Sequence, residues 1–163
     1  MAYDLIIRDV TIVTADDDFT VLDGHDLAIR GNRIAALGPT GTLEDATQIL
    51  DGRDQILLPG LINAHTHVGM SYFKATVAAM ELFKWLEWGW FYIERMDDDD
   101  IYWAAMLACM EMVRAGVTTF SDMYFSEKVI AKAVERTGLR ACLAESVMEP
   151  AGGMEMKSTI ASQ

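Results

Sequence analysis

The fold is decided by Leu57-Leu58-Pro59-Gly60-Leu61-Ile62-Asn63-Ala64-His65-Thr66-His67, which reads as a turn followed by a short apolar strand that ends in two histidines. Side chains two positions apart on a strand point to the same side. His65 and His67 can therefore direct both imidazoles at one point, while Thr66 faces away. A divalent metal with nitrogen ligands suits this arrangement. The alternative is that the two histidines lie on the strand and bind no metal. A short His-x-His motif on its own would favour this alternative, but the longer run favours the metal.

Two histidines supply only part of a catalytic metal centre. A catalytic zinc needs about three protein ligands and an open position. The third histidine, His25, lies in a predicted turn and is expected at the surface. Zinc lowers the pKa of its water toward about 7, which gives a nucleophile for an electron-poor ring carbon. Iron or manganese are alternatives, because nitrogen and oxygen ligands suit several ions.

Composition excludes several classes of protein. Of the 163 residues 52% are hydrophobic, so the chain is globular. A net charge of −12 repels nucleic acid and anionic membranes, so we expect neither as a partner. The start resembles no signal peptide, and no apolar run of about 18 residues exists. Cys109 and Cys142 are expected as a reduced interior pair, which indicates a cytoplasmic protein.

The first 57 residues predict a small β unit. Short apolar runs alternate with turn residues about every 8–12 positions, which is typical of antiparallel strands. Gly31-Asn32 lies between two such runs and predicts a hairpin.

The rest of the chain predicts alternating strands and helices, and therefore a parallel sheet. Asp97–Asp100 is expected to cap a helix that Gly116 ends. The strand, helix and strand that follow are expected over 117–123, 126–138 (with Ser126 as its cap) and 140–147. From Pro150 on, the sequence predicts no regular structure.

Aromatic side chains crowd the segment 81–94, downstream of the histidine strand. Loops after barrel strands lie on the face where active sites form. Trp85, Trp88 and Trp90 are compatible with a pocket wall for a flat heterocycle, with the core, or with an oligomer contact.

The run Pro59–His67, together with Asp122-Met123-Tyr124-Phe125, resembles the amidohydrolase superfamily. The similarity is strongest to its cytosine-deaminase-like branch, which includes methylthioadenosine and S-adenosylhomocysteine deaminases, guanine deaminase and triazine hydrolases. The resemblance implies an α/β fold: a (β/α)8 TIM barrel, whose first strand the two histidines close, and an amino-terminal β-sandwich portion. It implies His65 and His67 as metal ligands, with zinc as the metal. It also implies three substrate-binding residues: Glu94, which would hold ribose hydroxyls, Trp85 and Met70.

The length predicts an incomplete barrel. A complete one needs roughly 250 residues. We therefore expect residues 1–57 to form part of the sandwich domain and residues 58–163 to form the first barrel units, about three in number on that scale. In relatives the remaining ligands and the proton-transfer residues lie on later strands, so we assign no catalytic residue within this chain.

The resemblance implies a metal-dependent aminohydrolase, a deaminase acting on a small purine-nucleoside-like or triazine-like heterocycle. Two alternatives are a hydrolase of other C–N or C–Cl bonds on the same scaffold, and a non-catalytic fragment that needs its carboxyl-terminal half. The isolated chain is expected to be inactive, and the full-length protein to be a homo-oligomer. The other class of zinc deaminases is excluded, because His-x-Glu and Pro-Cys-x-x-Cys are both missing.

Overall fold

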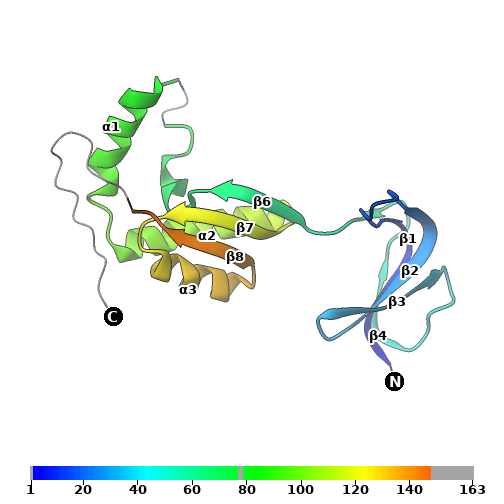
Figure 1. Cartoon of the computed structure of the whole chain (residues 1–163). Helices are drawn as coiled ribbons and strands as arrows, with labels where there is room; N and C mark the ends of the chain where they lie inside the picture. Colours follow the sequence, from blue (N-terminus) through cyan, green and yellow to red (C-terminus); the bar gives the residue numbers. More distant parts are fainter. Residues whose placement is uncertain (1, 77–78, 148–163) are drawn as a thin grey trace. The chain divides into compact units, whose positions relative to one another are not determined.

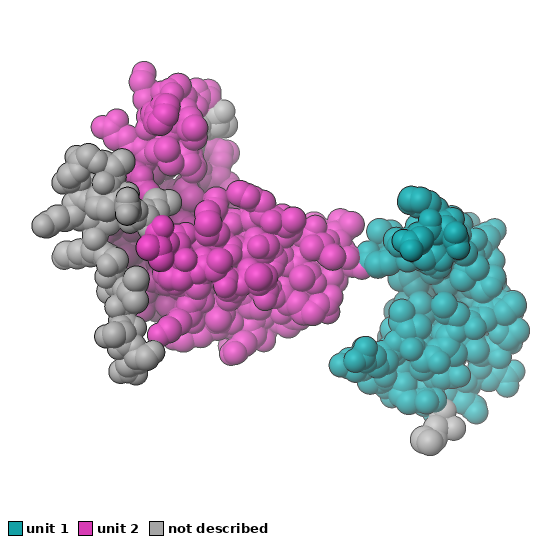
Figure 2. Space-filling model, viewed as in Figure 1, with its two compact units in different colours: residues 1–59 teal, residues 60–163 magenta. Residues whose placement is uncertain are grey.

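The computed structural model describes residues 2–76 and 79–147. The chain divides into two compact units, residues 1–59 and residues 60–163 (Figure 2). The segment from Pro150 on, for which no regular structure was expected, lies outside the described residues.

Unit 1 is a five-stranded sheet with the order β3-β2-β1-β4, in which β5 also pairs with β1. Its strands are β1 (Tyr3–Val13), β2 (Val21–Arg30), β3 (Arg33–Pro39), β4 (Ala46–Asp51) and β5 (Ile56–Leu57) (Figure 1). The hairpin predicted at Gly31-Asn32 is confirmed, because Arg30 pairs with Arg33 across it. Gly31 has a φ of +58°, the left-handed conformation that such a turn favours.

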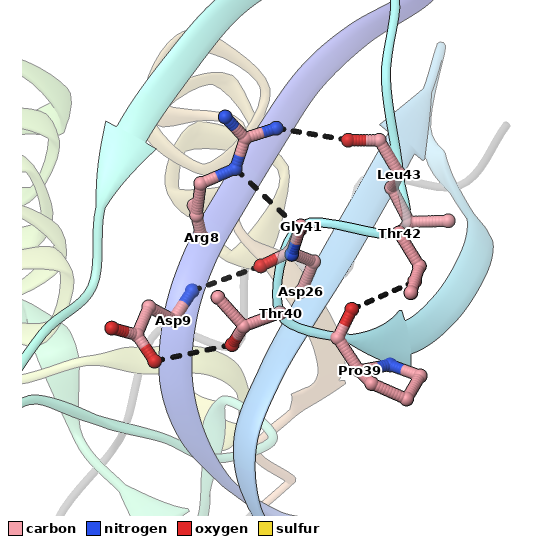
Figure 3. A network of polar contacts seen from close by, with 8 residues as sticks. All are labelled: Arg8, Asp9, Asp26, Pro39, Thr40, Gly41, Thr42 and Leu43. Carbon is pink, nitrogen blue, oxygen red and sulfur yellow. Dashed lines mark hydrogen bonds and ion pairs between the residues drawn. The ribbon is translucent and has the colours of Figure 1, made fainter.

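The prediction of a purely antiparallel unit was wrong, because β4 and β5 both run parallel to β1. A buried carboxylate explains the crossover. Asp26 is 0% exposed and accepts hydrogen bonds from the backbone N–H groups of Asp9 (3.0 Å) and Gly41 (2.9 Å). Arg8 lies 3.5 Å from this carboxylate and donates to the Leu43 carbonyl at 2.9 Å (Figure 3). The connection after β3 is thereby tied to β1 instead of turning back as a hairpin.

His25 also differs from expectation. It lies within β2, opposite Val10, and not in a turn. Its Nδ1 atom is 2.8 Å from the Asp23 carbonyl oxygen. Gly24 next to it has a φ of +59°, so the turn signal of the sequence marks an irregularity inside the strand.

Unit 2 carries a parallel sheet in the order β6-β7-β8, as the alternating pattern predicted. Its elements are β6 (Leu61–Thr66), the 3₁₀ helix η1 (Val68–Phe73), α1 (Leu82–Ile93), α2 (Asp98–Arg114), β7 (Val117–Tyr124), α3 (Glu127–Thr137) and β8 (Arg140–Glu145) (Figure 1). One core cluster joins α2, α3 and the sheet through residues such as Cys109, Phe120 and Ile130. The opposite face of the sheet is open, with Ile62 74% exposed.

The cysteines are not an interior pair. Cys109 is buried in the core, which raises the pKa of its thiol, but Cys142 is exposed. Side chains alternate along β8, so Ala141 and Leu143 pack on the core while Cys142 points to the open face. Both thiols are free.

The ends of α2 are as predicted. Asp97 accepts from the Asp100 N–H at 2.9 Å, and Asp100 accepts from the Asp97 N–H at 3.2 Å, which makes a capping box. Gly116 follows the helix with a φ of +77°. Among the described residues, no helix has both the length and the apolar character to cross a membrane.

Ser126 is the N-cap residue of α3, as predicted, but its side chain does not provide the cap. Ser126 takes a left-handed conformation, with a φ of +55°, and its side chain makes no capping hydrogen bond. The carboxylate of Glu145, at the end of β8, accepts from the backbone N–H groups of Ser126 and Glu127 instead, each at 2.9 Å. Gly138 ends the helix as expected, with a φ of +75°.

Candidate metal centre

The strand that carries the two histidines is fixed at its start by close backbone packing. A Cβ atom at Gly60 would overlap the side chain of Thr118 on β7, so only glycine fits there. The next residue, Leu61, donates its N–H to the Gly116 carbonyl at 2.9 Å. The turn before β6 is therefore held against the turn before β7, and the two strands start side by side.

His65 and His67 lie together at the carboxyl end of β6. Their ring centroids are 4.9 Å apart and the rings meet at 77°, in an edge-to-face contact. His65 is exposed and His67 is half-buried. Both side chains are therefore at least partly open to solvent.

A backbone carbonyl of the neighbouring strand selects the tautomer of His67. Its Nδ1 atom lies 2.7 Å from the Met123 carbonyl oxygen. A carbonyl oxygen can only accept, so Nδ1 carries the proton and donates it. In the neutral imidazole the lone pair then lies on Nε2, which is the form that binds a metal.

A group of buried acids lies directly beneath this strand end, and the sequence reasoning gave it no role. Asp122 is 1% and Glu127 is 6% exposed, and their carboxyl groups interact. Burial raises the pKa of both, that of Glu127 to about 7, and the Asp122 charge adds to the rise at Glu127. Burial also raises the pKa of Tyr124. The sequence contains one signal for this group, which is the acidic residue Asp122 at the end of the β-branched run that precedes Met123.

The three predicted substrate residues lie on two elements. Met70 lies in η1, where it is half-buried against the core and donates its N–H to the His67 carbonyl at 2.9 Å. Trp85 and Glu94 lie on α1 and at its carboxyl-terminal cap. Nine helical positions are two and a half turns, so Trp85 and Glu94 face opposite sides of the helix. The structure therefore brings Met70 close to the histidine strand and keeps Trp85 and Glu94 apart.

Aromatic contacts attach α1 to the rest of unit 2. Phe73 of η1 packs on Trp88 and Tyr92, with ring centroids 5.5 and 5.8 Å away, and Trp90 packs on Phe125 at 5.7 Å. Figure 1 shows α1 beyond the arrowheads of β6 and β7, at the end of the sheet that bears the histidines. Phe83 is 74% exposed, so one face of this helix is open.

A cavity of about 390 Å³ lies behind β6, between this strand, η1 and α2. His67 and Thr66 line it from the strand, and the Lys74–Glu111 ion pair lies at its wall. His65 does not line it, so the cavity does not lie between the two imidazoles. Over residues 2–76 and 79–147, no group of three or more histidine, cysteine or acidic side chains could hold a metal ion.

Comparison with known proteins gives one sequence relative and two solved structures of particular interest. The 5-methylthioadenosine/S-adenosylhomocysteine deaminase of Pelotomaculum thermopropionicum is 38% identical over 153 residues, which is 91% of this chain and 35% of the relative. An adenosine deaminase from Xanthomonas campestris with bound zinc has a TM-score of 0.80 and 28% identity, over 86% of this chain and 33% of its own. Atrazine chlorohydrolase from Arthrobacter aurescens TC1, complexed with zinc, has a TM-score of 0.80 and 27% identity, over 94% and 38%.

These matches define both the extent and the family of the chain. It spans about a third of the length of the curated relatives it matches. The profile of the amidohydrolase family matches residues 56–159, which include β6, both histidines and the whole described part of unit 2. With its two histidines at the end of the first strand of a parallel β/α sheet, this chain belongs to the amidohydrolase family.

Proposed function

We propose that the chain forms the amino-terminal part of a metal-dependent aminohydrolase that deaminates a purine-nucleoside-like or triazine-like heterocycle. One observation carries the proposal: His65 and His67 lie side by side at the carboxyl end of β6, and the Met123 carbonyl leaves Nε2 of His67 free. In this proposal residues 1–57 belong to a β-sandwich domain. Residues 58–163 supply the first β/α units of a TIM barrel, whose active site forms at the carboxyl ends of the strands.

The donor set fits zinc. Two neutral imidazoles from one strand end are the kind of nitrogen ligands that zinc takes, and iron or manganese would accept them too. When bound, zinc supplies a Lewis acid that activates water for attack on an electron-poor carbon. His65 and His67 would hold the ion, and further ligands would come from parts of the enzyme that the relatives possess beyond this third of their length.

The helix α1 supplies the proposed substrate contacts. Trp85 offers a flat apolar surface for a heterocyclic ring, and the Glu94 carboxylate accepts hydrogen bonds from sugar hydroxyl groups. Met70 lies on η1, three residues after His67, and completes the wall beside the metal ligands. Because Trp85 and Glu94 face opposite sides of α1 and lie nine residues apart, a single small substrate would contact only one of them in this arrangement.

Hydrolysis of a carbon–chlorine bond is the second candidate, which the similarity to atrazine chlorohydrolase supports. We further propose a cytoplasmic homo-oligomer without nucleic-acid or membrane partners. The net charge of −12 disfavours polyanionic partners, and two free thiols suit a reducing compartment.

Activity on a substrate panel tests the proposal. The protein encoded by the native gene is loaded with zinc and offered adenosine derivatives, guanine, pterins and chlorotriazines. We expect ammonia release from an adenosine derivative, and none from the His65→Asn or His67→Asn variant. Chloride release from a chlorotriazine without ammonia release would favour the second candidate. A protein that binds no metal and releases neither product would contradict both.

A further inference from the structure

Asp122 makes two contacts that enclose His67 along the chain. Its Oδ1 atom lies 2.5 Å from the Thr66 hydroxyl and accepts the Val68 N–H at 2.9 Å. Thr66 and Val68 are the residues immediately before and after His67. One oxygen atom on β7 therefore holds both chain neighbours of His67.

The sheet needs this support because its regular pairing fails there. The β6–β7 register is irregular between Asn63 and Thr66, which is the stretch that contains His65. Thr66 and Asp122 form the last pair between β6 and β7, after this irregular stretch. The Asp122 side chain therefore contacts β6 at the point where regular pairing returns. Beyond that position the His67 ring bonds to the carbonyl oxygen of Met123, the residue after Asp122, and contacts the His65 ring.

Asp122 is buried beside a second acid. It is 1% exposed, and its Oδ1 atom takes part in both contacts, whereas its Oδ2 atom has no hydrogen-bond partner among the described residues. The charge of Asp122 acts on the carboxyl group of Glu127, whose Oε1 atom accepts the Tyr124 N–H at 2.8 Å. A buried carboxylate is costly unless it is hydrogen-bonded, so the two bonds through Oδ1 to the histidine strand are the ones that offset the burial of Asp122.

We propose that Asp122 is a positioning residue for His67, an inference that rests on the proposed metal centre. By fixing Thr66 and Val68 it places the His67 ring against the Met123 carbonyl. The ring then keeps its proton on Nδ1 and presents Nε2 to the metal. What matters is the acceptor oxygen at this position, and not the negative charge.

Two substitutions at Asp122 separate the contribution of its acceptor oxygen from that of its negative charge. Asp122→Asn keeps an acceptor oxygen for Thr66 and Val68, and its amide can donate to Glu127. Asp122→Ala removes the acceptor. We expect nitrogen NMR of the metal-free, histidine-labelled chain to show the Nδ1–H tautomer of His67 in the wild type and in Asp122→Asn, and a mixture of tautomers in Asp122→Ala.

Cobalt titration followed by its visible absorption provides the second measurement. Loss of a residue that orients a metal ligand typically lowers metal affinity about 10–100-fold, and we expect a loss in this range for Asp122→Ala. For Asp122→Asn we expect an affinity within about threefold of the wild type, since the acceptor is kept. Asp99→Ala, in the first turn of α2, is the matched control and should change neither measurement.

The outcomes decide whether Asp122 positions His67 through its acceptor oxygen. An Asp122→Ala variant with the wild-type tautomer and affinity would overturn the positioning role. So would a folded Asp122→Asn variant that loses both, because charge would then be the cause. If Asp122→Ala does not fold, Thr66→Val removes one of the two bonds without a buried charge, and an unchanged His67 tautomer would overturn the role. If the wild-type protein binds no cobalt, the proposed function is contradicted but the positioning role of Asp122 is not, because nitrogen NMR measures the His67 tautomer in the absence of metal.

Discussion

The Nδ1 atom of His67 lies 2.7 Å from the backbone carbonyl oxygen of Met123, 56 residues further along the chain. No substitution at position 123 removes this acceptor, because it belongs to the backbone. The bond can therefore be tested at His67 itself, or at the residues that hold His67 in place, and not at position 123. This makes the histidine pair well suited to direct substitution.

Loss of either imidazole should abolish tight metal binding. We expect His65→Asn and His67→Asn each to weaken cobalt binding at least about tenfold, because one of two nitrogen ligands is lost. Isothermal titration measures the change. His25→Asn is the matched control, since His25 lies on β2 in the other unit. Equal weakening by His25→Asn would mean that the metal binds elsewhere.

Glu145 should stabilise α3 although it lies outside that helix. Glu145→Ala removes the acceptor for the N–H groups of Ser126 and Glu127. We expect the free energy of unfolding to fall by about 1–2 kcal/mol, the usual contribution of a helix cap. Urea unfolding followed by circular dichroism measures it. Glu135→Ala, at an exposed position of the same helix, should change it by less than about 0.5 kcal/mol. A similar loss in both variants would argue against the cap.

Gly69 should tolerate no side chain. A Cβ atom there would overlap the Tyr124 ring, so we expect Gly69→Ala to destabilise unit 2 by about 1–3 kcal/mol. Gly89, within α1, has nothing within 4 Å of such an atom. Gly89→Ala should therefore stabilise the helix by about 0.5–1 kcal/mol, because alanine loses less backbone entropy. Thermal unfolding compares the two. Equal melting temperatures of the Gly69→Ala and Gly89→Ala variants would show that the Tyr124 ring moves aside without a measurable cost in stability.

Stability should depend on pH through Glu127. Burial raises the pKa of this carboxyl group from 4.5 to about 7, so the folded chain binds its proton more tightly than the unfolded chain. The free energy of unfolding should therefore fall as pH rises from about 4.5 to 7, by at most about 3.5 kcal/mol, and then level off. Denaturant titrations at several pH values measure this slope. Glu127→Gln should flatten it and Glu135→Gln should not. A slope of opposite sign in the wild type would contradict the assignment.

Local signals in the sequence predicted much of the fold. The hairpin at Gly31-Asn32 and the helix limits at Asp97 and Gly116 were correct, because each depends on residues close together in the chain. The parallel order of β6, β7 and β8 followed from the alternation of strands and helices.

The errors share a different physical origin. The parallel course of β4 depends on Asp26 binding the Gly41 N–H, across 15 residues, and the start of α3 depends on Glu145, 19 residues after Ser126. No short pattern encodes such contacts. The role of Asp122 has no local signal for the same reason, since its partners Thr66 and Val68 lie more than 50 residues before it.

The two helix starts of unit 2 also differ in when they can form during synthesis. The Asp97–Asp100 box closes within one helical turn, so α2 can begin to form as soon as that turn leaves the ribosome. The first turn of α3 lacks its acceptor until Glu145 has emerged and β8 has docked. Until residues 140–145 have emerged, the first turn of α3 is therefore without its acceptor, whereas that of α2 is already capped. A chain shortened before residue 145 would thus keep the capping box of α2 and lose the cap of α3.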